Sequence, residues 1–227
     1  MPHLSEQDFG RPLRAPAPRA RLQPAAIDAE RSHVLVVTGP SGVGKGTLIR
    51  ALQERFPSLE LSVSATTREP RSGEVDGRDY WFLSDPEFDS RIEQGAFLEH
   101  AVYAGHRYGT LRSEVERAES ADGSPTGPSG LMLEIEVEGA RQVRAAMPEA
   151  IQVFIAPPSV ESLRERLLAR GSDSGEQIES RLAVARGELG AQREFAHVIV
   201  NDRLERAAEE LAGLVASIWG SSKGVQS

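Results

Sequence analysis

The sequence contains no cysteine, and this absence removes several classes of chemistry at once. A disulfide framework, a thiolate metal site and a cysteine nucleophile are all excluded. Lysine is nearly absent as well, because only Lys45 and Lys223 among the 26 basic residues are lysines. Lys45 lies in a glycine-rich stretch, where a compact ammonium suits a phosphate-binding loop as a point charge. The rare lysine therefore marks a candidate anion site.

Clustered positive charge and long apolar runs are also missing. The net charge of -8 and the pI near 5.3 argue against a broad nucleic-acid surface, which needs clustered cations. No apolar run approaches the ~20 residues that cross a bilayer, so we expect no membrane partner. The first 30 residues mix Pro, Ala and Arg without the apolar segment of a secretory signal. We expect residues 1–31 and 220–227 to be disordered tails and the protein to be cytoplasmic.

Four short runs rich in β-branched residues alternate with helix-length segments. They are His33 to Thr38, Leu131 to Val137, Ile151 to Ile155 and His197 to Val200. Such spacing is typical of parallel strands joined by crossover helices. Apolar residues recur at three- and four-residue intervals in 45–55, 138–146, 159–170, 176–194 and 203–219, which predicts five helices. The predicted fold class is α/β.

The stretch from residue 64 to residue 110 breaks this alternation. It contains the turn-rich "REPRSGEVDGRDY", the strand-like "YWFL", the amphipathic "PEFDSRIEQGAF" and the alternating "FLEHAVY". We interpret it as a small inserted α+β subdomain, so that residues 32–63 and 111–219 form the core. The breaker cluster in residues 119–130 predicts an exposed loop.

The stretch "GPSGVGK", Gly39 to Lys45, follows a predicted strand and precedes a predicted helix. This context surrounds an anion with backbone N–H groups at a helix N-terminus. Lys45 would reach the outer phosphates of a nucleotide. The candidate nucleotide-phosphate residues, which the resemblance described below assigns to ATP, are Gly39, Pro40, Ser41, Gly42, Val43, Gly44, Lys45, Gly46 and Thr47. Gly46 stands where the usual pattern has the Ser or Thr whose hydroxyl contacts Mg²⁺.

From about Val34 to Asp202 the chain resembles the guanylate kinases, which are P-loop nucleoside monophosphate kinases. The motifs are "GPSGVGK", "SVSATTREPRSGEVDGRDY", "GAFLEHAVYAGHRYGT", "LEIEVEGARQVR", "VFIAPPSVESLRERLLARG" and "HVIVND". The resemblance implies a three-layer core with a parallel sheet, a GMP-binding subdomain and a mobile lid at about 166–181. It also implies transfer of the γ-phosphoryl group of ATP to GMP, with Mg²⁺ as cofactor.

The resemblance further implies a GMP site in and beside the inserted subdomain. It assigns the GMP phosphate to Arg68, Arg71, Tyr80 and Tyr108, and the guanine edge to Ser64, Glu99, Thr110 and Glu136. A carboxylate can accept both the N1–H and the exocyclic amine of guanine, a donor pair that adenine lacks. We therefore expect Glu99 to select the base. Glu136 departs from the family, which usually has Asp at this position.

The remaining assignments concern ATP and the transfer step. The resemblance places Arg166, Arg170 and Arg181 on the phosphates of ATP when the lid closes, and Asn201 is the candidate contact for adenine. The expected catalytic set is Lys45, Arg68, Arg170 and Arg181. Mg²⁺ would be held mainly by nucleotide phosphates and water, with Thr47 and Glu134 as candidate contacts. The GMP phosphate is already anionic, so no strong general base is required.

Two other functions remain open from the residues. A non-catalytic guanylate-kinase-like binding module is disfavoured by the intact Lys45 and lid arginines. A kinase acting on another small molecule is disfavoured by Glu99 and Thr110 together with the two tyrosines. The sequence does not predict the oligomeric state.

Overall fold

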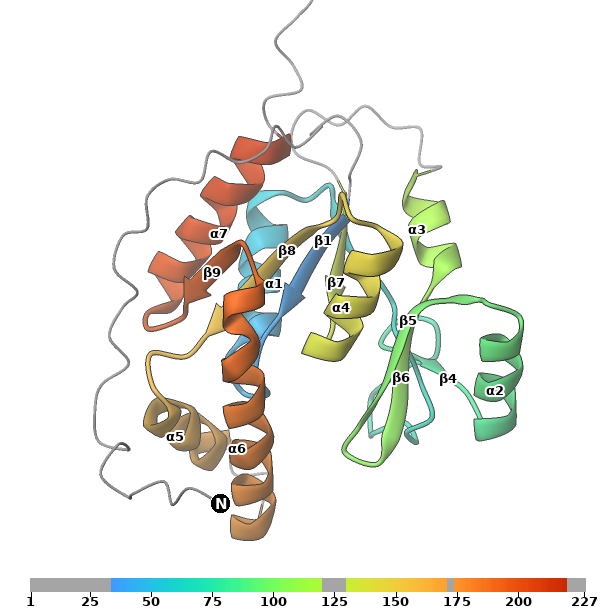
Figure 1. Ribbon diagram of the computed structural model, residues 1–227, viewed down its shortest axis with the longest axis horizontal. Helices are drawn as coiled ribbons and strands as arrows, with labels where there is room; N and C mark the ends of the chain where they lie inside the picture. Colours follow the sequence, from blue (N-terminus) through green and yellow to red (C-terminus); the bar gives the residue numbers. More distant parts are fainter. Residues whose placement is uncertain (1–33, 120–129, 171–173, 220–227) are drawn as a thin grey trace, which may run out of the picture.

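A five-stranded parallel sheet forms the centre of the fold in the computed structural model, which describes residues 34–119, 130–170 and 174–219. The strand order is β2-β7-β1-β8-β9 (Figure 1). The strands are β1 (Val34–Thr38), β2 (Leu59–Leu61), β7 (Gly130–Glu134), β8 (Ile151–Ala156) and β9 (His197–Val200). The four predicted strands are confirmed. β7 ends three residues earlier than predicted, because Glu136 already caps the following helix.

Helices cover both faces of this sheet and give it the predicted three layers. They are α1 (Lys45–Arg55), α3 (Arg112–Glu119), α4 (Val137–Ala146), α5 (Val160–Arg170), α6 (Gly175–Gly190) and α7 (Leu204–Trp219). The five predicted helices are confirmed with small shifts at their ends. The last residues of the predicted 176–194 helix form a separate 3₁₀ turn, η2 (Ala191–Glu194).

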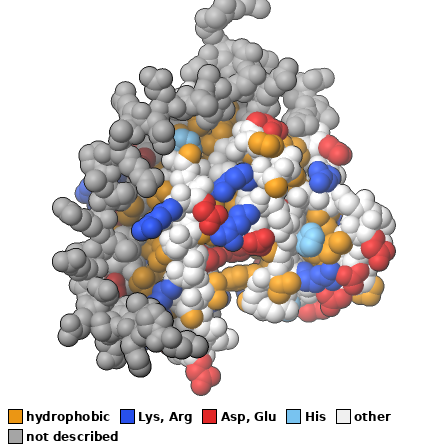
Figure 2. All heavy atoms as spheres, viewed as in Figure 1, with side chains coloured by type: hydrophobic (Ala, Val, Ile, Leu, Met, Phe, Trp, Pro, Cys, Tyr) orange, Lys and Arg blue, Asp and Glu red, His pale blue; other side chains and the backbone are white. Residues whose placement is uncertain are grey.

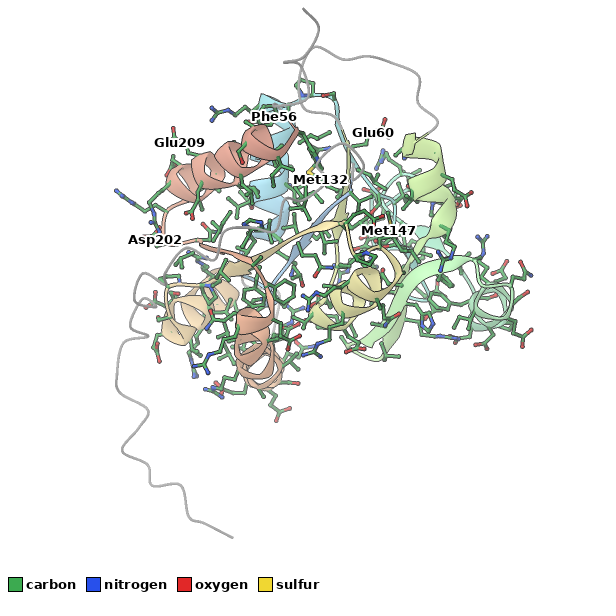
Figure 3. The ribbon with its side chains drawn as sticks, turned by 45° about the horizontal axis from the view of Figure 1, so that its top comes forward. Phe56, Glu60, Met132, Met147, Asp202 and Glu209 are labelled. Carbon is green, nitrogen blue, oxygen red and sulfur yellow. The ribbon has the colours of Figure 1, made fainter. Side chains whose placement is uncertain are left out.

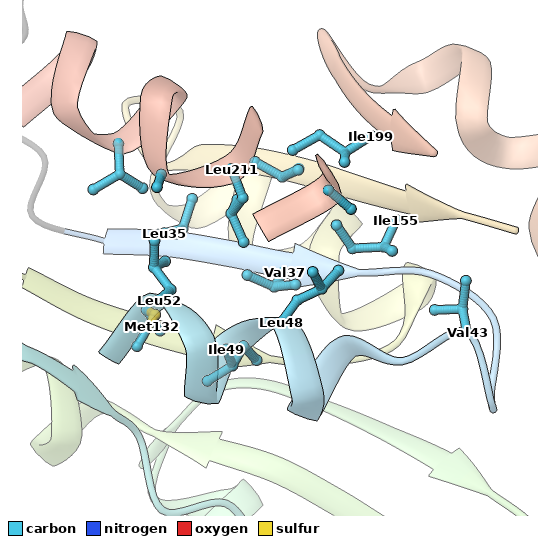
Figure 4. Packing of buried hydrophobic residues seen from close by; sticks show 14 of the residues in the cluster. Leu35, Val37, Val43, Leu48, Ile49, Leu52, Met132, Ile155, Ile199 and Leu211 are labelled. Carbon is cyan, nitrogen blue, oxygen red and sulfur yellow. The ribbon is translucent and has the colours of Figure 1, made fainter. Parts of the chain in front are cut away.

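Alternate residues of β1 belong to two different apolar cores. Leu35 and Val37 pack with Leu48, Leu52 and residues of α7 on one face, as Figure 4 shows. Val34 and Val36 pack with residues of α4 on the other face. Each core also takes in a partly buried side chain near a helix end, Phe56 after α1 and Met147 after α4 (Figure 3). A strand buried on both faces places its carboxyl end, and the loop that follows it, at a fixed point in the molecule.

A second, four-stranded mixed sheet lies beside the core (Figure 1). Its order is β4-β3-β6-β5, built from β3 (Ala65–Thr66), β4 (Trp81–Phe82), β5 (Phe97–Tyr103) and β6 (His106–Leu111). Helix α2 (Asp85–Glu93) packs on it through Phe88, whose ring stacks on Phe97 at 4.4 Å between centroids. The α/β fold class with a small α+β subdomain is therefore confirmed.

Some expectations are not tested by the described residues. The two tails, most of the expected 119–130 loop and residues 171–173 lie outside them. The domain bounds of 64–110 stay a prediction. Within the described part of the chain, no helix is both long and apolar enough to span a bilayer.

Candidate functional site

Three glycines bend the loop that joins β1 to α1. Gly39, Gly42 and Gly44 have φ angles of 139°, 83° and 100°, which side chains rarely allow. A Cβ on Gly39 would also lie 2.2 Å from the carbonyl oxygen of Ile155. Gly44 caps α1 without a side-chain hydrogen bond, so the first amides of α1 remain available to a ligand. The loop has the geometry of an anion cradle at a helix N-terminus.

Lys45, the first residue of α1, is held inside this loop. Its side chain is 8% exposed, and Nζ donates a hydrogen bond to the carbonyl of Gly39 at 2.6 Å. The same Nζ lies 4.0 Å from Oε1 of Glu136. The ammonium is therefore positioned over the loop and is not extended into solvent.

A cavity of about 440 Å³ separates the phosphate loop from the small sheet. On the face of the molecule drawn in Figure 2, basic and acidic side chains lie close together near the middle. The loop supplies one side of the cavity and the small sheet the other. Its lining includes the predicted residues Ser41, Lys45, Gly46, Thr47, Ser64, Tyr80, Glu99, Tyr108, Glu134 and Glu136. Residues predicted for the two substrates thus face a common space.

Glu99 is the most deeply buried carboxylate that lines this cavity. Its residue is 4% exposed, and Oε1 accepts a hydrogen bond from the hydroxyl of Thr110 at 2.7 Å. Burial raises the pKa of the Glu99 carboxyl. Thr110 is fully buried and does not line the cavity, so it affects a ligand there only by orienting Glu99. The pair presents one oriented carboxyl group to a ligand.

The two arginines predicted for the GMP phosphate differ in their surroundings. Arg68 pairs with Glu74 at 2.9 Å, and its guanidinium lies 5.2 Å from the ring centroid of Tyr80. The hydrogen bond with Glu74 raises the pKa of Arg68, so the guanidinium stays charged. Glu74 also accepts the backbone N–H of Arg71 at 2.7 Å, whereas the side chain of Arg71 is exposed. Glu74, which was not predicted, thus organises this turn.

The carboxyl groups of Glu136 and Glu188 lie beside the phosphate loop, and the sequence did not predict Glu188 as part of the site. Glu188 of α6 lies close enough to Glu136 and to the backbone of Ser41 for both to affect its pKa, and one carboxyl oxygen of each glutamate is buried without a hydrogen-bond partner. Burial, with Glu136 as the second cause, raises the pKa of Glu188 to about 8. A carboxyl group with such a pKa is mainly protonated at neutral pH, so Glu188 can act as a hydrogen-bond donor beside the loop. A sequence signal exists, because Glu188 follows the buried Ala185 by one helical turn.

Burial also shifts the pKa of Glu134, at the end of β7. Desolvation raises it, and the nearby charge of Lys45 opposes the rise. A Cβ built on Gly46 would lie 3.5 Å from Oε2 of Glu134. The carboxylate therefore lies directly beside the position of the missing hydroxyl.

A second cavity, of about 300 Å³, opens on the far side of the loop, next to Arg166 and Asn201. Arg166 donates to the carbonyls of Val43 at 3.0 Å and Asn201 at 2.7 Å, and Nδ2 of Asn201 donates to Val43 at 2.8 Å. Arg170 is the last residue of α5, and its side chain lies outside the described part. Arg181 is partly buried on α6. Two of the predicted ATP residues thus meet the loop.

The loop, its lysine and the cavity at the carboxyl ends of a parallel sheet define a P-loop nucleotide-binding protein. The guanylate kinase family model matches residues 31–218. Known guanylate kinases are similar to this chain. The guanylate kinase of Synechococcus sp. (strain CC9311) is 54% identical, and the match covers 82% of this chain and 95% of the Synechococcus protein. That of Mycobacterium tuberculosis (strain CDC 1551 / Oshkosh) is 48% identical, with 87% and 91% covered. The chain therefore belongs to the guanylate kinase family.

A solved structure agrees with this membership. The crystal structure of guanylate kinase from Anaplasma phagocytophilum is 28% identical, with a TM-score of 0.65. The similarity covers 84% of this chain and 88% of that one.

Proposed function

We propose that this chain transfers the γ-phosphoryl group of ATP to GMP, giving ADP and GDP for purine nucleotide metabolism. Membership of the guanylate kinase family supports this reaction. The observation that supports GMP as the phosphoryl acceptor is the buried Glu99, which Thr110 orients in the cavity that faces the phosphate loop. A non-catalytic module needs no such pairing of a base-selecting group with an intact loop.

GMP would lie in the 440 Å³ cavity against the small sheet. The ionised carboxylate of Glu99 would accept the N1–H and exocyclic amine of guanine, with Ser64 and Glu136 nearby. Adenine offers no matching pair of donors, so a polar site built for guanine rejects it strongly. The GMP phosphate would meet the two tyrosine hydroxyls and the guanidinium groups of Arg68 and Arg71.

ATP would lie across the phosphate loop, with its base towards the cavity lined by Arg166 and Asn201. The loop amides and Lys45 would hold the phosphates. A GMP phosphate oxygen then attacks the γ-phosphorus in line, and ADP leaves from the opposite side. Catalysis is positioning and charge neutralisation by Lys45, Arg68, Arg170 and Arg181. In this proposal the segment at about 166–181 closes as a lid and excludes water.

The residues beside the loop fit Mg²⁺, a hard cation that prefers oxygen ligands. Thr47 and Glu134 both line the main cavity and offer a hydroxyl and a carboxylate. Nucleotide phosphates and water would supply the other ligands. When bound, the ion neutralises charge on the β- and γ-phosphates. In place of the usual hydroxyl at Gly46, the carboxylate of Glu134 lies 3.5 Å from where a Cβ would stand.

Replacing Gly46 by serine should lower the Mg²⁺ concentration that gives half-maximal turnover, because the new hydroxyl adds a protein oxygen near the ion. The Cβ fits, since the nearest atom outside its own helical turn, Oε2 of Glu134, lies 3.5 Å away. The measurement is initial rate against total Mg²⁺ at fixed ATP and GMP. Gly213→Ser on α7, where nothing lies within 4 Å of a Cβ, is the matched control. An unchanged Mg²⁺ requirement in Gly46→Ser would contradict this account of the position.

The acceptor is tested with a coupled ADP-release assay across GMP, AMP, CMP and UMP. GMP should be strongly preferred, and Glu99→Gln should lower kcat/KM for GMP by about 10²-fold or more, because an amide leaves one guanine donor unmatched. The other three acceptors should change little. No turnover with any acceptor would favour the binding module, and preference for another base would favour a different kinase.

A further inference from the structure

Helix α4 of the core is joined to the small sheet beside Glu99. Gln142 accepts the backbone N–H of His100 at 3.1 Å and donates to its carbonyl at 2.8 Å. Strand β5 is the edge strand of that sheet. The amide of Gln142 therefore takes the place of a peptide group on a neighbouring strand. This pair fixes the backbone one residue after Glu99.

Gly139 precedes Gln142 by three residues and so lies on the same side of α4. A Cβ on Gly139 would stand 2.3 Å from Oε2 of Glu99 and 3.0 Å from its Cδ. At such a distance the Glu99 carboxylate, which Thr110 holds by a hydrogen bond, would have to shift to make room for any side chain here. Glycine inside a helix costs about 1 kcal/mol relative to alanine. Helix propensity therefore does not explain Gly139, whereas the position of Glu99 does.

We propose that Gly139 and Gln142 are positioning residues that set the orientation of the Glu99 carboxylate and thereby the choice of base. The inference rests on the proposed role of Glu99 towards guanine. Thr110 holds Oε1, Gly139 bounds the space around Oε2, and Gln142 fixes the strand. Accepting two parallel N–H groups requires a fixed carboxylate plane, which these three contacts provide. The core helix thus takes part in recognising the acceptor.

Gly139→Ala is the direct test. The new methyl group pushes the carboxylate aside, so KM for GMP should rise about tenfold or more. The preference for GMP over IMP should shrink, because IMP lacks the exocyclic amine that a well-placed carboxylate rewards. KM for ATP should stay unchanged, and kcat at saturating GMP should fall less than kcat/KM. These values come from initial rates with both acceptors, and thermal unfolding checks the fold.

Two further variants keep the test informative if Gly139→Ala folds poorly. Gln142→Ala inserts no atom, and it should also raise KM for GMP and weaken the preference over IMP. Shortening the carboxylate in Gly139→Ala/Glu99→Asp should recover part of the GMP affinity lost in Gly139→Ala. Gly213→Ala, at an exposed helical glycine with open space around it, is the matched control and should change none of these values.

The Glu99→Gln variant distinguishes failure of the proposed role of Glu99 from failure of the positioning role of Gly139 and Gln142. If Glu99→Gln leaves KM for GMP and the base preference unchanged, the proposed role of Glu99 fails. If Glu99→Gln weakens GMP while folded Gly139→Ala and Gln142→Ala both keep the wild-type KM and preference, this inference alone is overturned. A loss of thermal stability with unchanged preference would likewise overturn it, because it would show a structural role only.

Discussion

Replacing Arg181 by alanine should lower kcat by about 10³-fold or more and leave the dissociation constant for GMP largely unchanged. An arginine that neutralises charge on a transferring phosphoryl group contributes about 10³ to 10⁵ in rate in comparable enzymes. Arg181 lies on α6, which begins directly after the loop of the proposed lid. GMP, in contrast, would be held by the small sheet. The measurements are initial rates by ADP release and GMP binding by calorimetry.

Arg186→Ala is the matched control for this change. Arg186 is on the same helix and is exposed, so its loss removes the same charge without touching the proposed transfer site. It should retain near-normal turnover, since exposed charges interact weakly across solvent. Arg181→Ala with normal turnover and impaired GMP binding would refute the assignment.

Replacing Lys45 by methionine should lower kcat by about 10²- to 10³-fold, the usual effect of removing one preorganised electrostatic group. Methionine is unbranched and only one atom shorter than lysine, so the fold should persist. The variant loses the ammonium that lies 2.6 Å from the carbonyl of Gly39, and ATP affinity should fall with it. Initial rates and ATP binding measured by calorimetry report the two effects separately.

Lys45→Arg tests whether charge alone suffices. A guanidinium is larger and planar, whereas Lys45 is 8% exposed in a tightly bent loop. Lys45→Arg should therefore remain strongly impaired. Wild-type turnover in Lys45→Met would contradict the role of this residue, and recovery in Lys45→Arg would show that the loop geometry is less restrictive.

The sequence predicted the phosphate loop well because its parts are contiguous. Gly39, Gly44 and Lys45 are fixed by a local strand-turn-helix pattern, which is visible without tertiary contacts. Glu74, Glu188 and Gly139 were missed for the opposite reason. The contacts of Glu188 and Gly139 join segments far apart in the chain, and the contact of Glu74 depends on how one turn closes. The roles of the individual site residues stay predictions until the variants are measured.

The elements that the sequence failed to predict, β2 and α3, also have physical explanations. Strand β2 was missed because Leu59–Leu61 is three residues long, contains no β-branched residue and is exposed at two of them. Helix α3 was missed because Val115 is the sole buried apolar residue among its described side chains, so apolar periodicity is weak. Longer strands such as β8, buried throughout, were predicted nearly to the residue.

The contact between Glu188 and Ser41 has a mechanical consequence. Glu188 lies near the end of α6 and touches the phosphate loop, whereas Gly175 begins the helix at the proposed lid. The helix between them is about 20 Å long at 1.5 Å per residue. A tilt of about 10° around the Glu188 end would therefore displace Gly175 by about 3 Å. In the proposed closure, α6 would act as a lever that pivots near the phosphate loop, so a small shift at Ser41 would become a larger movement at Gly175.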